Sequence, residues 1–162
     1  MSSQVVIALG GNVGDTKKVL QYSTELIEEK IGIVTKQSSL YITKAWGVTN
    51  QPDFVNQVIV VNSKLKPEEV LSECLNIEYE IGRRRIKNER WEQRIIDLDI
   101  LFYDLIEFNS KNLVIPHPLL HERNFVLYPL AEILPEFIHP TLHKSIFELK
   151  KICNDTLMVE KM

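Results

Sequence analysis

Apolar residues recur along this chain at two spacings, every second position in some segments and every third or fourth in others. The first spacing is typical of strands and the second of amphipathic helices. The pattern predicts strands over 4–9, 33–43, 53–62 and 94–102, and helices over 16–30, 67–81, 119–134 and 145–152. Gly32 and Gly82 follow the first two helices and are expected to end them, and Pro129 is expected to break or bend the third.

The order of these segments predicts a single α+β domain over residues 1–162. The chain has 162 residues, of which 44% are hydrophobic and 25% charged, so it is long and apolar enough to bury a core. Strand and helix alternate as β-α-β-β-α-β, with additions after residue 103. We therefore expect a sandwich in which helices pack on one face of a mainly antiparallel sheet.

The strand over 94–102 contains two carboxylates in an apolar run. Because side chains alternate along a strand, Asp97 and Asp99 are expected on one face. The opposite face is expected to carry Ile96, Leu98, Ile100 and Phe102. The aspartates would lie roughly 7 Å apart, close enough to share a divalent ion or to hold one each of a pair. The alternative is a structural network in which neighbouring arginines neutralise them.

A basic segment leads directly into this strand. Residues 83–94 carry six basic and two acidic side chains, although the whole chain has a net charge of −3. Such local charge favours a small polyanion such as a nucleoside triphosphate over a long nucleic acid. Trp91 is placed to stack on a base or to cap a packed edge. A solvated basic loop is the plainer alternative.

Three other features have both a structural and a functional interpretation. The glycine-rich turn at 10–15 lacks the phosphate-loop spacing, so a strand-to-helix turn with Asp15 as helix N-cap is favoured. Asn56 interrupts an apolar strand, as an edge residue or as a contact to a ligand. His117 stands between two prolines, which fix its direction, whereas His121 is expected at the surface or at a helix end.

Cysteine usage and the N-terminus bear on the compartment. Cys74 and Cys153 lack metal-site spacing, and Cys74 is expected to be a buried structural thiol. The first residues lack the features of a signal peptide, and no apolar run is long enough to span a membrane. The cytoplasm is the expected location.

Four motifs occur in order along residues 4–138: LGGNVGD, TKAWGVTNQPDFVN, GRRRIKNERWEQRIIDLDILFYD and IPHPLLHERNFVLYPLAEILPE. Together they resemble the 6-hydroxymethyl-7,8-dihydropterin pyrophosphokinase family of folate biosynthesis, in its stand-alone form. The resemblance implies a ferredoxin-like α+β fold and an ATP-dependent diphosphokinase that transfers pyrophosphate to the pterin hydroxymethyl group and releases AMP. It also implies two Mg²⁺ ions and a monomer whose partners are ATP and the pterin, with no nucleic acid or membrane.

The resemblance assigns roles residue by residue. It implies that Asp97 and Asp99 hold both metal ions and that Arg83 and Arg94 act with them in catalysis. Contacts to ATP are implied for Glu78, Arg85, Trp91, Arg94, Ile100, His117 and Arg123. The pterin is implied to lie between Phe54 and Phe125, with further contacts from Thr43, Trp46 and Asn56.

Two other functions remain as alternatives. A different two-metal nucleotidyl or phosphoryl transferase would use Asp97 and Asp99 but would not need Phe54, Asn56 and Phe125 together. A nucleic-acid-binding module would use the basic segment 83–94, but the net charge of −3 and the carboxylate pair argue against it.

Overall fold

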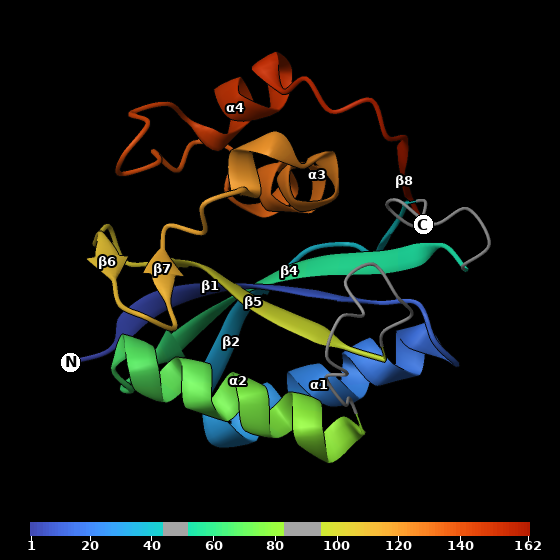
Figure 1. Ribbon diagram of the computed structural model, residues 1–162, viewed down its shortest axis with the longest axis vertical. Helices are drawn as coiled ribbons and strands as arrows, with labels where there is room; N and C mark the ends of the chain where they lie inside the picture. Colours follow the sequence, from blue (N-terminus) through green and yellow to red (C-terminus); the bar gives the residue numbers. More distant parts are fainter. Residues whose placement is uncertain (44–51, 83–94) are drawn as a thin grey trace.

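The computed structural model describes residues 1–43, 52–82 and 95–162 of the chain. Within these ranges the centre of the protein is a six-stranded antiparallel sheet, ordered β5-β1-β4-β3-β8, with β2 also paired to β4 (Figure 1). Its strands are β1 (Ser3–Gly11), β2 (Gly32–Gln37), β3 (Tyr41–Thr43), β4 (Phe54–Ser63), β5 (Asp97–Tyr103) and β8 (Val159–Lys161). A separate ribbon pairs β6 (Phe108–Asn109) with β7 (Val114–Ile115).

Helices α1 (Thr16–Lys30) and α2 (Pro67–Ile81) cover one face of the sheet, with the bounds predicted from periodicity. Asp15 caps α1, because its Oδ1 accepts a hydrogen bond from the Lys18 amide at 3.3 Å. Gly82 ends α2 in a left-handed conformation, with φ of 111°. Cys74 is buried in the apolar cluster beneath α2, as expected for a structural thiol.

The opposite face of the sheet is covered by α3 (Asn124–Ile133), and α4 (Ile146–Ile152) packs on α3, farther from the sheet in Figure 1. The prediction of helices on one face only is therefore wrong. The physical reason is that the central strands are apolar on both faces. Alternate residues of β4 enter separate clusters, with Ile59 and Val61 facing α1 and α2, and Val58 and Val60 facing α3.

Strand β5 changes face part-way along its length. Val6 of β1 pairs with Phe102, but the next residue, Ile7, pairs with Ile100, so Leu101 is an extra residue in a β-bulge. Leu101 and Phe102 consequently lie in the α3 cluster, whereas Leu98 and Ile100 lie in the α1–α2 cluster. The prediction that Phe102 shares a face with Ile100 is wrong, because it assumed unbroken alternation.

The strand predicted over 33–43 is divided in two. Strands β2 and β3 pair with the same side of β4, but the pairing is interrupted at Ser38. There the Ser38 hydroxyl accepts a hydrogen bond from the Val58 amide, and the Ser38 carbonyl accepts one from the Gln57 side chain. A serine side chain thus replaces part of the strand ladder. Strand β8, which pairs with β3, was not predicted at all.

The helix predicted over 119–134 begins later than expected. Residues Leu120–Glu122 form a single 3₁₀ turn, and Arg123 is extended, with φ of −129°. Helix α3 begins at Asn124 and continues through Pro129 to Ile133. Every helix in 1–43, 52–82 and 95–162 is too short or too polar to cross a membrane.

Candidate active site

Three neighbouring strands place a carboxylate, a glycine and a carboxamide in one row. Gly10 of β1 pairs with Asp97 of β5 on one side and with Asn56 of β4 on the other. Opposed residues of antiparallel strands point to the same face, which here is the face covered by α3. Two strand spacings separate Asp97 from Asn56, or about 10 Å across the sheet. Only the main chain of Gly10 lies between them in this row.

Asp97 and Asp99 lie on the same face of β5, as predicted from alternation. Asp99 is exposed and pairs with Ala8, and Asp97 is half-buried. No group of three or more acidic, histidine or cysteine side chains suited to a metal ion occurs among the described residues. Two carboxylates nevertheless fit Mg²⁺, because this ion commonly takes one or two protein carboxylates and completes its shell with substrate phosphates and water.

Asn56 and Thr43 present buried polar atoms to the same side of the sheet. Asn56 is 8% exposed and Thr43 is 3% exposed, and within the described ranges neither Asn56 Nδ2 nor Thr43 Oγ1 has a hydrogen-bond partner. Thr43 pairs with Phe54, two residues before Asn56 on the same face. Because an unsatisfied buried polar group is costly, two of them beside an aromatic ring indicate a site for a polar planar ligand.

His117 is held close to Asp99 in a defined orientation. Its amide donates to the Leu101 carbonyl at 3.0 Å, and its ring Nδ1 accepts from the Leu119 amide at 3.2 Å. Burial lowers the pKa of His117 below its ordinary value. The Asp99 carboxylate raises this pKa, whereas Arg123 lowers it further, and the net shift is downward. The ring is therefore neutral at pH 7, with its proton on Nε2, where it can be donated to a ligand.

Arg123 and Phe125 lie at the beginning of α3. The Arg123 guanidinium carbon is 5.6 Å from the centre of the Phe125 ring, so the cation covers one aromatic face. Phe125 packs against the α3 cluster, on the same side of the sheet as Phe54 and Asn56. The structure thus brings the predicted pterin residues Thr43, Phe54, Asn56 and Phe125 to the face that carries both aspartates.

Two of the residues assigned to ATP lie on the other side of the sheet or within the core. Glu78 is 4% exposed on α2, and its Oε2 accepts a hydrogen bond from the Leu98 amide of β5 at 2.8 Å. The Ile100 side chain is buried in the α1–α2 cluster, so a contact to ATP would come from its main chain. Their roles at the nucleotide stay predictions. Trp46, Arg83, Arg85, Trp91 and Arg94 lie outside the described residues.

The glycine-rich turn contributes two features that the sequence did not reveal. A Cβ on Gly10 would lie 2.5 Å from Asn56 Oδ1, so this position must be glycine for the carboxamide to lie where it does. Asn12 is buried, and its Nδ2 donates to the Pro52 carbonyl at 3.0 Å. Gly14 supplies the positive φ, 71°, of the expected turn. Strand register, which the sequence does not specify, was needed to connect Gly10 with Asn56.

Comparison with known proteins identifies the family. A family model described as 7,8-dihydro-6-hydroxymethylpterin-pyrophosphokinase (HPPK) matches residues 6–135. The chain belongs to the HPPK family. A 2-amino-4-hydroxy-6-hydroxymethyldihydropteridine pyrophosphokinase from Aquifex aeolicus is 40% identical over 146 residues, covering 90% of this chain and 89% of the relative. The enzyme of that name from Bacillus subtilis is 40% identical over 134 residues, covering 82% and 79% of the two chains.

Solved structures support the HPPK fold. The wild-type HPPK-DHPS of Plasmodium falciparum matches with a TM-score of 0.76 at 17% identity. The match covers 93% of this chain but only 44% of that chain, which is much longer. At this identity the likeness concerns the fold alone, and it confirms the ferredoxin-like α+β class predicted from the sequence.

Proposed function

We propose that this chain transfers pyrophosphate from ATP to the hydroxymethyl group of 6-hydroxymethyl-7,8-dihydropterin, releasing AMP, as a step of tetrahydrofolate biosynthesis. Membership of the HPPK family supports the reaction class. The observation that carries the proposal for this chain is the row Asp97–Gly10–Asn56. In this row the carboxylate that we propose as a metal ligand and the carboxamide that we propose as a pterin ligand are about two strand spacings apart on one face of the sheet.

The pterin half of the site is built around Asn56. Its Nδ2, which has no hydrogen-bond partner among residues 1–43, 52–82 and 95–162, would together with Thr43 Oγ1 offer hydrogen bonds to the edge of a flat heterocycle. Phe54 and Phe125 would hold the two faces of the ring, with Trp46 contributing from residues 44–51. A ring bound at Asn56 would direct its hydroxymethyl group along the row toward Asp97.

The nucleotide half of the site is built around His117. Its Nδ1 is occupied by the Leu119 amide, so the neutral ring donates from Nε2 to a phosphate oxygen. Arg123 would add positive charge beside it, and Arg83, Arg85 and Arg94 would neutralise the triphosphate from the basic segment. Glu78, Ile100 and Trp91 complete the proposed contacts with ATP.

The chemistry is an in-line displacement at the β-phosphorus of ATP. The pterin hydroxyl oxygen forms a bond to this phosphorus while the bond to the bridging oxygen of AMP breaks, and the hydroxyl proton passes to solvent. Two Mg²⁺ ions held by Asp97 and Asp99 would neutralise charge on the phosphates and acidify the hydroxyl. The protein's own contribution is to orient both substrates and hold the phosphates.

The pterin site distinguishes this function from the alternatives. Another two-metal transferase would share Asp97 and Asp99, but it would not explain the two buried polar atoms beside Phe54 that have no partner in the described part of the chain. We further propose that the protein acts in the cytoplasm as a monomer, without nucleic acid or membrane partners. The net charge of −3 supports the absence of a nucleic-acid partner.

The test is AMP release measured in a coupled assay, with ATP, Mg²⁺ and the hydroxymethyldihydropterin. Asp97→Asn and Asp99→Asn should each lower kcat by about 100-fold or more while the far-UV circular dichroism spectrum is unchanged, because each removes a metal ligand without changing side-chain size. Glu136→Gln, which neutralises an exposed carboxylate, serves as the matched control and should retain activity. Pterin-independent AMP release, or near-normal turnover by either aspartate variant, would contradict the proposal.

A further inference from the structure

The C-terminal residues 153–162 lie beyond the part of the chain that matches the family model, which ends at residue 135. They nevertheless contact two elements of the pterin half of the site. At one end of this tail, Asp155 Oδ2 accepts a hydrogen bond from the Asn124 amide at 2.9 Å, and the Asp155 carbonyl accepts one from Asn124 Nδ2 at 3.0 Å. Asn124 is the first residue of α3 and directly precedes Phe125.

The other end of the tail is strand β8, which lies along β3. Val159 pairs with Thr43, Lys161 pairs with Tyr41, and the Met162 amide donates to the Leu40 carbonyl at 2.9 Å. Without β8, strand β3 would be an unpaired sheet edge immediately before residues 44–51. The tail therefore supports the strand that carries Thr43.

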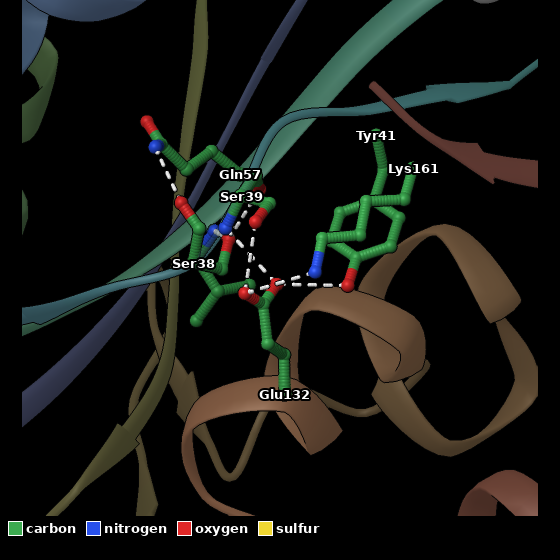
Figure 2. Close-up of polar contacts among 7 residues, drawn as sticks. Ser38, Ser39, Tyr41, Gln57, Glu132 and Lys161 are labelled. Atoms are coloured by element: carbon green, nitrogen blue, oxygen red, sulfur yellow. Dashed lines mark hydrogen bonds and ion pairs between the residues drawn. The ribbon is translucent and has the colours of Figure 1, made fainter.

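Glu132, in the last turn of α3, connects the tail to the sheet through side chains (Figure 2). Its carboxylate accepts hydrogen bonds from the Tyr41 hydroxyl at 2.8 Å and from the Ser39 hydroxyl at 2.9 Å. The Lys161 ammonium lies 3.8 Å from the same carboxylate. Helix α3 is thus tied to β3 at its last turn and to Asp155 at its first.

Asp155 supplies a cap that α3 lacks locally. Arg123 occupies the N-cap position and makes no side-chain capping hydrogen bond. The first amides of a helix have no partners within the helix, and a carboxylate there satisfies one of them and interacts favourably with the helix dipole. The start of α3, and with it Phe125, is therefore positioned by a residue 31 positions later in the chain.

Resting on the proposed function, we propose that Asp155 and strand β8 are positioning elements for the pterin half of the site. Only four peptide units link Asp155 to Val159, a span of at most about 14 Å, so the tail restricts the separation between Phe125 and Thr43. Strand β5, which carries Asp97 and Asp99, is at the opposite edge of the sheet from β8. Arg123, a proposed ATP contact, directly precedes Asn124, so loss of the tail contacts should weaken the pterin clearly more than ATP, rather than the pterin alone.

The experiment measures dissociation constants of hydroxymethyldihydropterin, with a non-cleavable ATP analogue and Mg²⁺ present, and of the analogue alone. Asp155→Ala should weaken pterin binding about fivefold through loss of the cap, with ATP-analogue binding changed less than about twofold. Asp155→Asn retains an oxygen acceptor and should restore most of the affinity. The KM for the pterin should likewise rise in Asp155→Ala, and the KM for ATP should change much less.

A second pair of variants tests β8 independently. Because amides alternate in direction along a strand, Glu160 N–H faces β3 as Met162 N–H does. Glu160→Pro removes that donor and should weaken the pterin selectively. Glu160→Ala keeps the amide and removes an exposed carboxylate, so it is a control for both Glu160→Pro and the charge change in Asp155→Ala. It should bind both ligands as the unsubstituted chain does.

The outcomes separate this proposal from the proposed function. If the unsubstituted chain fails to release AMP, the function is wrong, and faster amide exchange at 124–128 in Asp155→Ala still reports whether the tail orders α3. If the chain is active but Asp155→Ala and Glu160→Pro leave pterin binding unchanged, the positioning role is wrong. Equal weakening of both ligands, accompanied by a lower melting temperature, would also overturn it, because it would show a general effect on stability.

Discussion

The position of the Asn56 carboxamide depends on the absence of a Cβ atom at Gly10. Asn56 Oδ1 lies in the space that a Cβ at position 10 would require, and its Nδ2 is buried with no partner in the described part of the chain. Gly10 thus leaves room for the carboxamide, whose donor is unsatisfied among the described residues. A buried donor of this kind favours a ligand that supplies the missing acceptor.

Gly10→Ala is expected to displace the Asn56 side chain, because the new Cβ would lie 2.5 Å from Oδ1. Pterin affinity should fall about tenfold through loss of a well-aligned hydrogen bond, with little effect on ATP. Calorimetric titration of each ligand measures the two effects. In a double-mutant cycle with Asn56→Ala, the losses should be clearly less than additive. Full additivity would show that Gly10 acts elsewhere.

At the scale of elements, β3 and α3 are joined by a short polar network. Tyr41 donates to Glu132, whose pKa is lowered because the hydrogen bonds from Tyr41 and Ser39, with Lys161 nearby, outweigh the opposing effect of burial. Burial, and then the same carboxylate, raise the pKa of Tyr41 from its ordinary value of 10.0 to about 12. The contact thus requires an ionised Glu132 and a neutral Tyr41.

Tyr41→Phe should lower the free energy of unfolding by about 1 kcal/mol at neutral pH, the typical net value of one hydrogen bond. The raised pKa means that folded protein holds the Tyr41 proton more tightly than unfolded protein does. This contribution is complete below pH 10 and is lost as the pH rises toward about 12. Urea unfolding at a series of alkaline pH values should show a shallower loss in Tyr41→Phe. Tyr22→Phe alters an exposed tyrosine and should leave the profile unchanged.

Elements specified by local sequence were predicted more accurately than those specified by distant contacts. Helix 16–30 carries its own cap and apolar stripe, so its bounds follow from spacing. Helix α3 takes its cap from Asp155, and no local signal marks its start. Strand β8 is three residues long and exists through pairing with β3. In the candidate site, alternation along the strand predicted that Asp97 and Asp99 share a face. The close approach of Gly10 to Asn56 could not be predicted, because it depends on how β1 and β4 are aligned.

At the scale of the whole molecule, most proposed site residues in the described part of the chain lie on one face of the sheet, and the apolar cluster beneath α1 and α2 lies on the other. Asp97, Asp99, Asn56 and Phe125 lie on the α3 face, and the α1–α2 face contributes an apolar cluster and the buried anchor Glu78. The α3 face is also the one with buried histidine. His139 lies beneath the loop that precedes α4, where its Nδ1 accepts hydrogen bonds from two main-chain amides.

The stability of the whole protein should therefore decline in mild acid. Burial lowers the pKa of His139 below 6.5, His121 and His143 lower it further, and Glu107 opposes them. A lowered folded-state pKa contributes stability above pH 6.5 that is lost as the pH falls through the folded value. His139→Asn retains an acceptor near the Nδ1 position and should reduce the decline in melting temperature between about pH 7.5 and pH 5.

The control for this prediction is His143→Asn. His143 is exposed and has φ of 56°, a conformation that asparagine tolerates, so the substitution removes an imidazole without straining the backbone. Because His143 is only a secondary cause of the lowered pKa of His139, this variant should keep most of the acid decline and lose much less of it than His139→Asn does. An unchanged decline in His139→Asn would assign the acid sensitivity to another group.

The bulge at Leu101 has a consequence for how strictly the face on which Asp97 and Asp99 lie is specified. If the first half of β5 slipped by one residue, Asp97 and Asp99 would point into the apolar cluster beneath α1 and α2. If the bulge were lost, Phe102 would leave its place beside Phe137. A slip in either half of β5 would thus disrupt apolar packing and be unfavourable. The native packing therefore keeps both aspartates on the α3 face. The bulge therefore links correct packing of Phe102 to correct placement of the two carboxylates proposed to bind metal.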